Sequence, residues 1–152
     1  MQPYKTPSAI ILVLERNVGG KKQILLQRRR NTGFADGLWD FACAGKVEEG
    51  ETLAQTVVRE AREELGICVS ADELNFLCLV HKRDEQFNLT YYNAYFGCTE
   101  FVGEPKICES EKCSDLRWFD SDNLPDDLIE DRRQAYKTNL NGVHYLEYGW
   151  SR

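Results

Sequence analysis

Three glutamates crowd one short stretch of the chain, "GETLAQTVVREAREELGI", at Glu60, Glu63 and Glu64. Like charges three or four residues apart on a helix repel each other, so a helix does not gain stability from them. Two interpretations are open: the cluster is a solvated acidic face, or it supplies oxygen ligands for a hard dication such as Mg²⁺. In the second case the metal would offset the repulsion and bind a phosphate group.

The sequence around these glutamates predicts the helix that would position them. Thr52 and Gln55 form a T-x-x-Q capping box, and Gly66 is placed as a C-terminal stop. One apolar stripe repeats between these signals, at Ala54, Val58, Ala61 and Leu65. At 100° per residue, the three carboxylates then fall within about 100° on the flank and back of the helix, away from the stripe.

Composition limits the class of protein. The chain has 152 residues, which predicts a single domain over 1–152. Its 25 acidic and 19 basic side chains give a net charge of −6, which disfavours a nucleic acid polymer as partner. The longest early apolar run, residues 9–14, predicts neither a membrane span nor a signal peptide. The six cysteines form no C-x-x-C pair, so we expect reduced thiols and a cytoplasmic protein.

The remaining pattern predicts strands with a second helix. Alternating or continuous apolar runs predict strands at 8–16, 21–30 and 38–47, a long hairpin from 73–83 and 89–101, and a short strand after Ser114. A helix is expected from Pro125, with Asp126 and Asp127 in its first turn, to just before Asn141, followed by a strand within 143–150. This order predicts an α/β (α+β) domain in which a mixed sheet lies between helices.

The stretch from Gly45 to Ile67, "GKVEEGETLAQTVVREAREELGI", resembles the Nudix box, G-x5-E-x7-R-E-U-x-E-E-x-G-U with U apolar. All seven fixed letters are present. The segments "ILLQRRRNTGFADGLWDF" and "ESEKCSDLRWFDSDNLP" also resemble the parts of the family on either side of the box. The resemblance implies the Nudix fold and a Mg²⁺-dependent hydrolase, with Mn²⁺ as a substitute.

The resemblance also implies roles for individual residues. Catalytic parts are implied for Glu51, Arg59, Glu60, Glu63 and Glu111, with Arg59 and Glu51 orienting the other carboxylates. Metal ligands are implied at Glu60, Glu63, Glu64, Glu111 and the carbonyl oxygen of Ala44. Gly45 would allow close approach of the backbone and is grouped with substrate binding. Glu109 is the second choice for the acid outside the helix.

For several other residues the sequence allows either a role in substrate binding or a purely structural or solvent-exposed position. Arg28 and Arg30 would share one strand face and contact substrate phosphate, or lie at a solvated strand end. Of the aromatic residues Phe34, Trp39, Tyr91, Tyr92 and Trp118, at most two are expected to contact substrate, the rest being core. His81 and His144 are expected to be structural.

The loop before the box departs from the family pattern. It reads Cys43-Ala44-Gly45 where many members have P-G-G. An active-site cysteine here would suggest an isopentenyl-diphosphate isomerase, but the strict box favours a core role for Cys43.

The resemblance predicts hydrolysis of the diphosphate linkage in a small nucleotide, a (d)NTP cleaved to (d)NMP and pyrophosphate. The alternatives are a nucleotide-sugar pyrophosphatase of the ADP-ribose type, a non-catalytic nucleotide sensor with the same fold, and the isomerase. A homodimer is compatible with the sequence.

Overall fold

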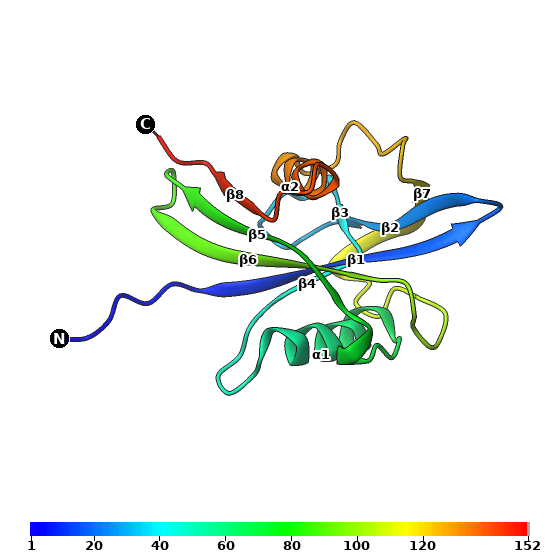
Figure 1. The fold of residues 1–152 in the computed structure, drawn as a ribbon, viewed down its shortest axis with the longest axis horizontal. Helices are drawn as coiled ribbons and strands as arrows, with labels where there is room; N and C mark the ends of the chain where they lie inside the picture. Colours follow the sequence, from blue (N-terminus) through cyan, green and yellow to red (C-terminus); the bar gives the residue numbers. More distant parts are fainter. Residues whose placement is uncertain (152) are drawn as a thin grey trace.

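A computed structural model describes residues 1–151 of the chain. It contains a mixed β-sheet with one helix against each face, which confirms the predicted α/β (α+β) architecture (Figure 1). The elements are β1 (Ser8–Val18), β2 (Lys21–Arg29), β3 (Trp39–Phe41), β4 (Cys43–Lys46), α1 (Leu53–Leu65), a 3₁₀ turn (Ala71–Glu73), β5 (Asn75–Asp84), β6 (Leu89–Cys98), β7 (Cys113–Asp120), α2 (Glu130–Leu140) and β8 (Tyr145–Tyr148).

Strand β1 is the centre of the sheet. The strand order is β3-β2-β1-β6-β5-β8, with β4 also paired to β1 and β7 to β2. β1 runs antiparallel to β2 and β4 but parallel to β6. The segment 30–46 therefore begins at the end of β2 and ends in β4, which pairs with β1.

Burial on both faces explains the continuous apolar run in β1. Ile10, Leu12 and Leu14 pack on the side of α1, with Val57, Ala61 and Leu65. Ile11 and Val13 pack on the opposite side, with Ala135 and Tyr136 of α2. Because successive side chains of a strand point to opposite faces, every residue of this run is covered by one helix or the other.

Helix α1 has the predicted ends but a rotated buried face. Thr52 accepts a hydrogen bond from the Gln55 amide, and Gly66 ends the helix in the left-handed region at φ 68°. The fully buried residues are Thr56, Val57, Ala61 and Leu65, so the predicted stripe through Ala54 and Val58 was wrong. Thr56 can be buried because its hydroxyl donates to Glu51 and to the Thr52 carbonyl oxygen.

Two other boundaries differ from the sequence prediction. The segment 38–47 forms two strands, with a break at Ala42. Helix α2 begins at Glu130 and not at Pro125, because backbone bonds from Trp39 to Asp127 and from Ile129 to Trp39 hold residues 127–129 extended beside β3. The acids of its first turn are consequently Glu130 and Asp131. Among residues 1–151, no helix is long and apolar enough to cross a membrane.

Candidate active site

A side chain of helix α1 lies directly against strand β4 at Gly45. A Cβ atom built at Gly45 would lie 2.3 Å from Cδ and 2.5 Å from Oε1 of Glu60. Contacts this short do not occur, so any residue other than glycine here would require the Glu60 carboxylate to leave its present position. Glu60 therefore faces the sheet, and the predicted position on the back of the helix was wrong.

Arg59 fixes the acidic residues around it. Its Nε and Nη2 donate to the two carboxylate oxygens of Glu51, at 2.7 and 3.0 Å. Its Nη1 donates to Glu60 at 2.7 Å and to Glu63 at 3.3 Å, and Nη2 also reaches the Lys46 carbonyl oxygen. The hydrogen bonds from Arg59 lower the pKa of Glu51 to about 2. Arg59 thereby connects the loop before α1 to the carboxylates on it.

Glu64 is the acid of α1 that faces a cavity. Its Oε2 accepts a hydrogen bond from the Ala44 amide at 3.2 Å. Burial, and then the negative charge of Glu60, raise the pKa of Glu64 to about 8, and burial also raises the pKa of Glu60. Glu63 instead lies on the outer side, with its side chain 53% exposed.

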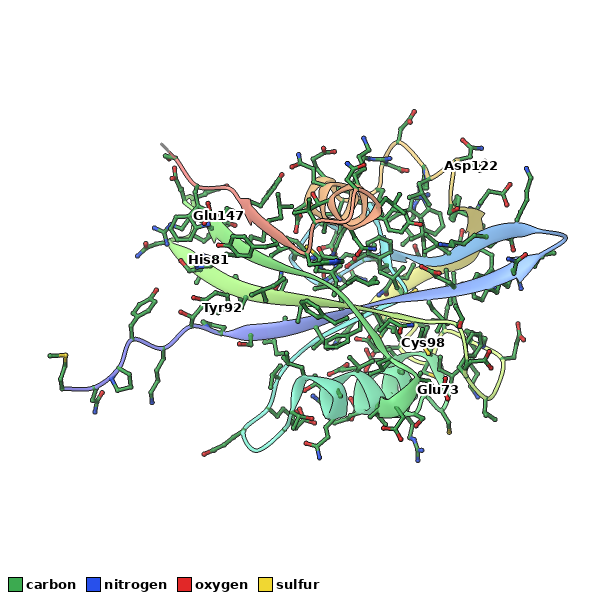
Figure 2. All side chains as sticks on the ribbon, viewed as in Figure 1. Glu73, His81, Tyr92, Cys98, Asp122 and Glu147 are labelled. Carbon is green, nitrogen blue, oxygen red and sulfur yellow. The ribbon has the colours of Figure 1, made fainter. Side chains whose placement is uncertain are left out.

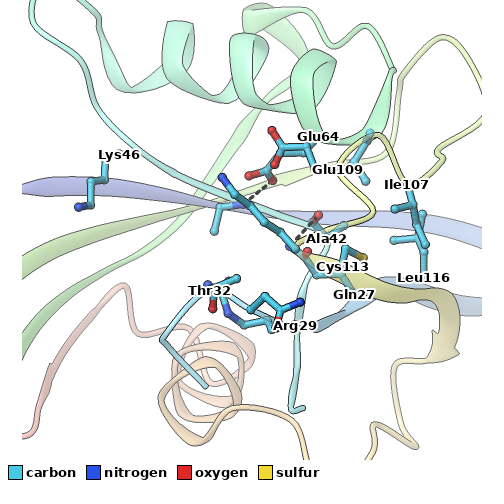
Figure 3. A pocket seen from close by; sticks show the side chains of 14 residues that line it. Gln27, Arg29, Thr32, Ala42, Lys46, Glu64, Ile107, Glu109, Cys113 and Leu116 are labelled. Carbon is cyan, nitrogen blue, oxygen red and sulfur yellow. Dashed lines mark hydrogen bonds between the residues drawn. The ribbon is translucent and has the colours of Figure 1, made fainter. Parts of the chain in front are cut away.

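The cavity beside Glu64 has a volume of about 470 Å³ and is closed on one side by the loop 99–112 (Figure 3). This loop is attached to the C-terminal end of α1 by backbone bonds from Lys106 to Leu65 and from Cys108 to Glu64. As a result Glu109 lines the same cavity as Glu64. The cavity is thus lined by Glu109, the second choice for the acid outside the helix, and not by Glu111, the first choice.

Three cationic side chains line the cavity as well: Arg29, Lys46 and Lys112. Neither lysine forms an ion pair within residues 1–151. Cations that no carboxylate neutralises favour an anionic ligand in this space.

Arg29 is held in place from behind by a buried network. Its Nη1 donates to Asp40 at 3.1 Å, and its Nε donates to the Phe34 carbonyl oxygen at 2.8 Å. Asp40 is fully buried and also accepts from Nε of Arg132 at 2.7 Å. Helix α2 therefore contributes to the cavity indirectly, through Arg132 and Asp40.

The comparisons with known proteins agree with this geometry. The NUDIX domain family model matches residues 5–138. The chain belongs to the Nudix family. A curated relative, the NAD-capped RNA hydrolase NudC of Stutzerimonas stutzeri, is 31% identical over 123 residues, which are 81% of this chain but 39% of that protein. CTP pyrophosphohydrolase of Escherichia coli is 36% identical over 91 residues, 60% of this chain and 62% of the relative.

A solved structure gives the same result for the fold. The MutT Nudix hydrolase of Burkholderia pseudomallei superposes with a TM-score of 0.76 at 28% identity, over 88% of this chain and 98% of that one. The family model and this structure together show that the chain has the Nudix fold. Because it spans less than two thirds of the length of the curated relatives described above, the activities of those whole proteins are not transferred to it.

The Nudix box residues fit a divalent cation. Glu60 and Glu64 offer carboxylate oxygens, the donors that Mg²⁺ prefers, and burial is the main cause of the raised pKa of both. Glu63 is turned toward Arg59, and residues 1–151 contain no convergent group of three acidic, histidine or cysteine side chains. Mg²⁺ usually takes only one or two carboxylates, so the pair is sufficient.

Several predicted site residues of this Nudix domain lie outside the cavity. Arg28 pairs with Asp127 and lies over the Trp39 ring. Arg30 follows the end of β2 and donates to the Ser110 carbonyl oxygen. Glu111 is exposed. The structure corrects the choice of face on β2, because the cavity is lined by Gln27 and Arg29.

The aromatic candidates and the histidines also lie elsewhere. Trp39 is buried in the core, and none of the five predicted aromatic residues lines the cavity. His81 stacks on Tyr92 with ring centroids 4.6 Å apart, on the β5–β6 pair (Figure 2). Nδ1 of His144 donates a hydrogen bond to the Leu77 carbonyl oxygen. Both histidines have structural contacts, as expected.

Cys43 is fully buried in the core on the α1 side, and burial raises the pKa of its thiol. A neutral buried thiol supports the core role over that of an isomerase nucleophile.

Proposed function

We propose that this Nudix hydrolase converts a nucleoside or deoxynucleoside triphosphate to the monophosphate and pyrophosphate. The observation that carries the proposal is the charge of the cavity, where Lys46, Lys112 and Arg29 outnumber the carboxylates of Glu64 and Glu109. Two unpaired lysines suit a chain of phosphates better than an uncharged leaving group. A relative named CTP pyrophosphohydrolase is consistent with this class of substrate.

Glu60 and Glu64 would hold Mg²⁺, or Mn²⁺ in its place, with Glu63 and the Ala44 carbonyl oxygen remaining predicted further ligands. The ion would neutralise phosphate oxygens and lower the pKa of a bound water. Arg59 and Glu51 keep Glu60 in position through the bonds described above. Lys46, Lys112 and Arg29 would bind and orient the phosphates.

Glu109 is the proposed proton acceptor for the attacking water, in place of Glu111. It comes from a loop bonded to the backbone of Glu64 itself, so its position is coupled to that of the metal-binding helix. A general base must lie within reach of the water, and Glu109 lines the cavity that Glu64 faces.

Turnover should be measured with Mg²⁺ across ribonucleoside and deoxyribonucleoside triphosphates, with ADP-ribose as the rival substrate. Reaction in ¹⁸O-water, followed by mass spectrometry of both products, identifies the phosphorus that is attacked. We expect a monophosphate and pyrophosphate. A preference for ADP-ribose, or release of inorganic phosphate, would refute the triphosphate proposal.

Glu64→Gln should lower kcat by at least about 10²-fold, because charge stabilisation at the phosphate is a large contribution to catalysis. Glu49→Gln is the matched control, since it removes the same charge from an exposed position just before α1. Equal rates for the two variants would contradict the role given to Glu64.

A further inference from the structure

Gln27 lines the cavity and has a fixed orientation. Its side-chain Nε2 donates to two backbone carbonyl oxygens, those of Phe41 and Ala42, each at 3.1 Å. Both amide hydrogens are therefore used. Gln27 lies two residues after Leu25, which packs on the α1 side, so alternation along β2 places Gln27 on that side too.

The amide cannot reverse without cost. Phe41 and Ala42 are at most 1% exposed and lie where β3 ends and β4 has not begun. Their carbonyl oxygens need donors, because buried backbone acceptors without partners are destabilising. A reversed amide would set its own oxygen against these two oxygens, so the carbonyl group of Gln27 must point away from them.

The carbonyl oxygen of Gln27 is left without a donor. Within the part of the chain that the structure describes, no N–H or O–H group donates to Oε1, and this atom is not among the buried polar atoms that lack a partner. It is thus an accessible acceptor in the cavity wall. Leu65, Ile107 and Leu116 line the same cavity and make the surroundings of this acceptor partly apolar.

Gln27 lies away from Lys46, although Arg29, two residues further along β2, lies beside Gln27. Figure 3 shows Lys46 on one side of the cavity, Ile107 and Leu116 on the other, and Gln27 between them. With the phosphates near Lys46 and Glu64, the part of the cavity lined by Gln27, Ile107 and Leu116 is left for the nucleobase. A flat ring fits between apolar side chains, and a fixed acceptor favours a ring that carries a hydrogen-bond donor on its edge.

From this geometry we infer that Gln27 determines base specificity, and that its carbonyl oxygen accepts a hydrogen bond from the exocyclic amino group of the nucleobase. The inference rests on the proposed nucleotide substrate and narrows it to the amino-substituted bases, cytosine, adenine and guanine. A base with a carbonyl group at that position would place two acceptors against each other, and the acceptor of Gln27 would be desolvated without a partner.

The test compares nucleotides that differ only in the amino group. CTP is paired with the triphosphate of 2-pyrimidinone riboside, and ATP with that of purine riboside; neither analogue gains a ring N–H. The pair to use is the one whose amino compound, CTP or ATP, is hydrolysed faster. For that pair we expect the wild-type kcat/KM to favour the amino compound by about 10- to 100-fold. Gln27→Met, which keeps the length and loses the acceptor, should bring this ratio close to one.

The ratio separates specificity from a structural role. If Gln27 only satisfied Phe41 and Ala42, its loss would slow both members of a pair equally and leave the ratio unchanged. Gln23→Met is the control: it makes the same change on β2 outside the cavity and should keep the wild-type ratio. Gln27→Leu, with melting temperatures for all variants, guards against a Met variant that fails to fold.

The outcomes distinguish this inference from the proposed function. If no nucleoside triphosphate is hydrolysed, the proposed function fails. If triphosphates are hydrolysed but the wild-type enzyme does not distinguish the paired compounds, or Gln27→Met keeps the distinction, the role of Gln27 is overturned while the proposed function stands.

Discussion

Replacement of Gly45 by alanine tests whether the contact between β4 and α1 sets the position of Glu60. The added Cβ would lie 2.3 Å from Glu60 Cδ, whereas ordinary contacts begin near 3.4 Å. The carboxylate must therefore retreat by roughly 1 Å, and its 2.7 Å bond from Arg59 must lengthen or break. A displacement of this size at a catalytic group can cost about 10²-fold in rate, or about 2.7 kcal/mol.

The assay is kcat under saturating Mg²⁺ and the best nucleotide of the substrate panel, with the melting temperature measured alongside. Gly97→Ala is the matched control: it also adds a Cβ within a strand at a glycine without positive φ, but the nearest atoms are the Leu77 methyl carbons at 3.3 Å. Those methyl groups can shift, so we expect activity within roughly twofold of wild type. A folded Gly45→Ala enzyme with wild-type kcat would refute the argument that glycine is needed for Glu60.

Three further predictions concern stability and metal dependence. Asp40→Asn should lower the free energy of unfolding by about 3 kcal/mol, because Arg132 stays buried without its carboxylate; equal urea midpoints for variant and wild type would contradict this. The pKa of Glu51, lowered to about 2 by Arg59, means that its contribution is complete above the ordinary value of 4.5 and is lost as the pH falls toward 2. Melting temperatures between pH 5 and 2 should therefore fall less steeply for Glu51→Gln than for the wild type, and parallel curves would count against the ion pair. EDTA should abolish turnover, and Mg²⁺ or Mn²⁺ in excess should restore it; unchanged turnover in EDTA would exclude the metal-dependent mechanism.

Local sequence signals placed the helix of the site accurately. Thr52, Gln55 and Gly66 act through hydrogen bonds within a few residues, so the ends of α1 follow from the sequence alone. The start of α2 did not follow in this way. The helix begins only at Glu130 because residues 127–129 pair with Trp39, which lies nearly 90 positions earlier in the sequence.

The candidate site shows the same division. The box letters identified Gly45, Arg59, Glu60 and Glu64 because the motif is contained in 23 consecutive residues. In contrast, Gln27, Arg29 and Glu109 come from β2 and from a loop, and no local pattern marks them. Strand alternation separated Arg29 from Arg28 and Arg30, but it could not say which face would meet α1.

The sequence by itself determined the family, the first strand and the helix that carries the acidic residues, since these depend on spacing along the chain. Only the tertiary structure decided that Glu60 and Glu64 turn inward and that Gln27, Arg29 and Glu109 line the cavity. The physical reason is that a side chain's direction follows from local geometry, but what it meets there depends on how distant strands, helices and loops pack.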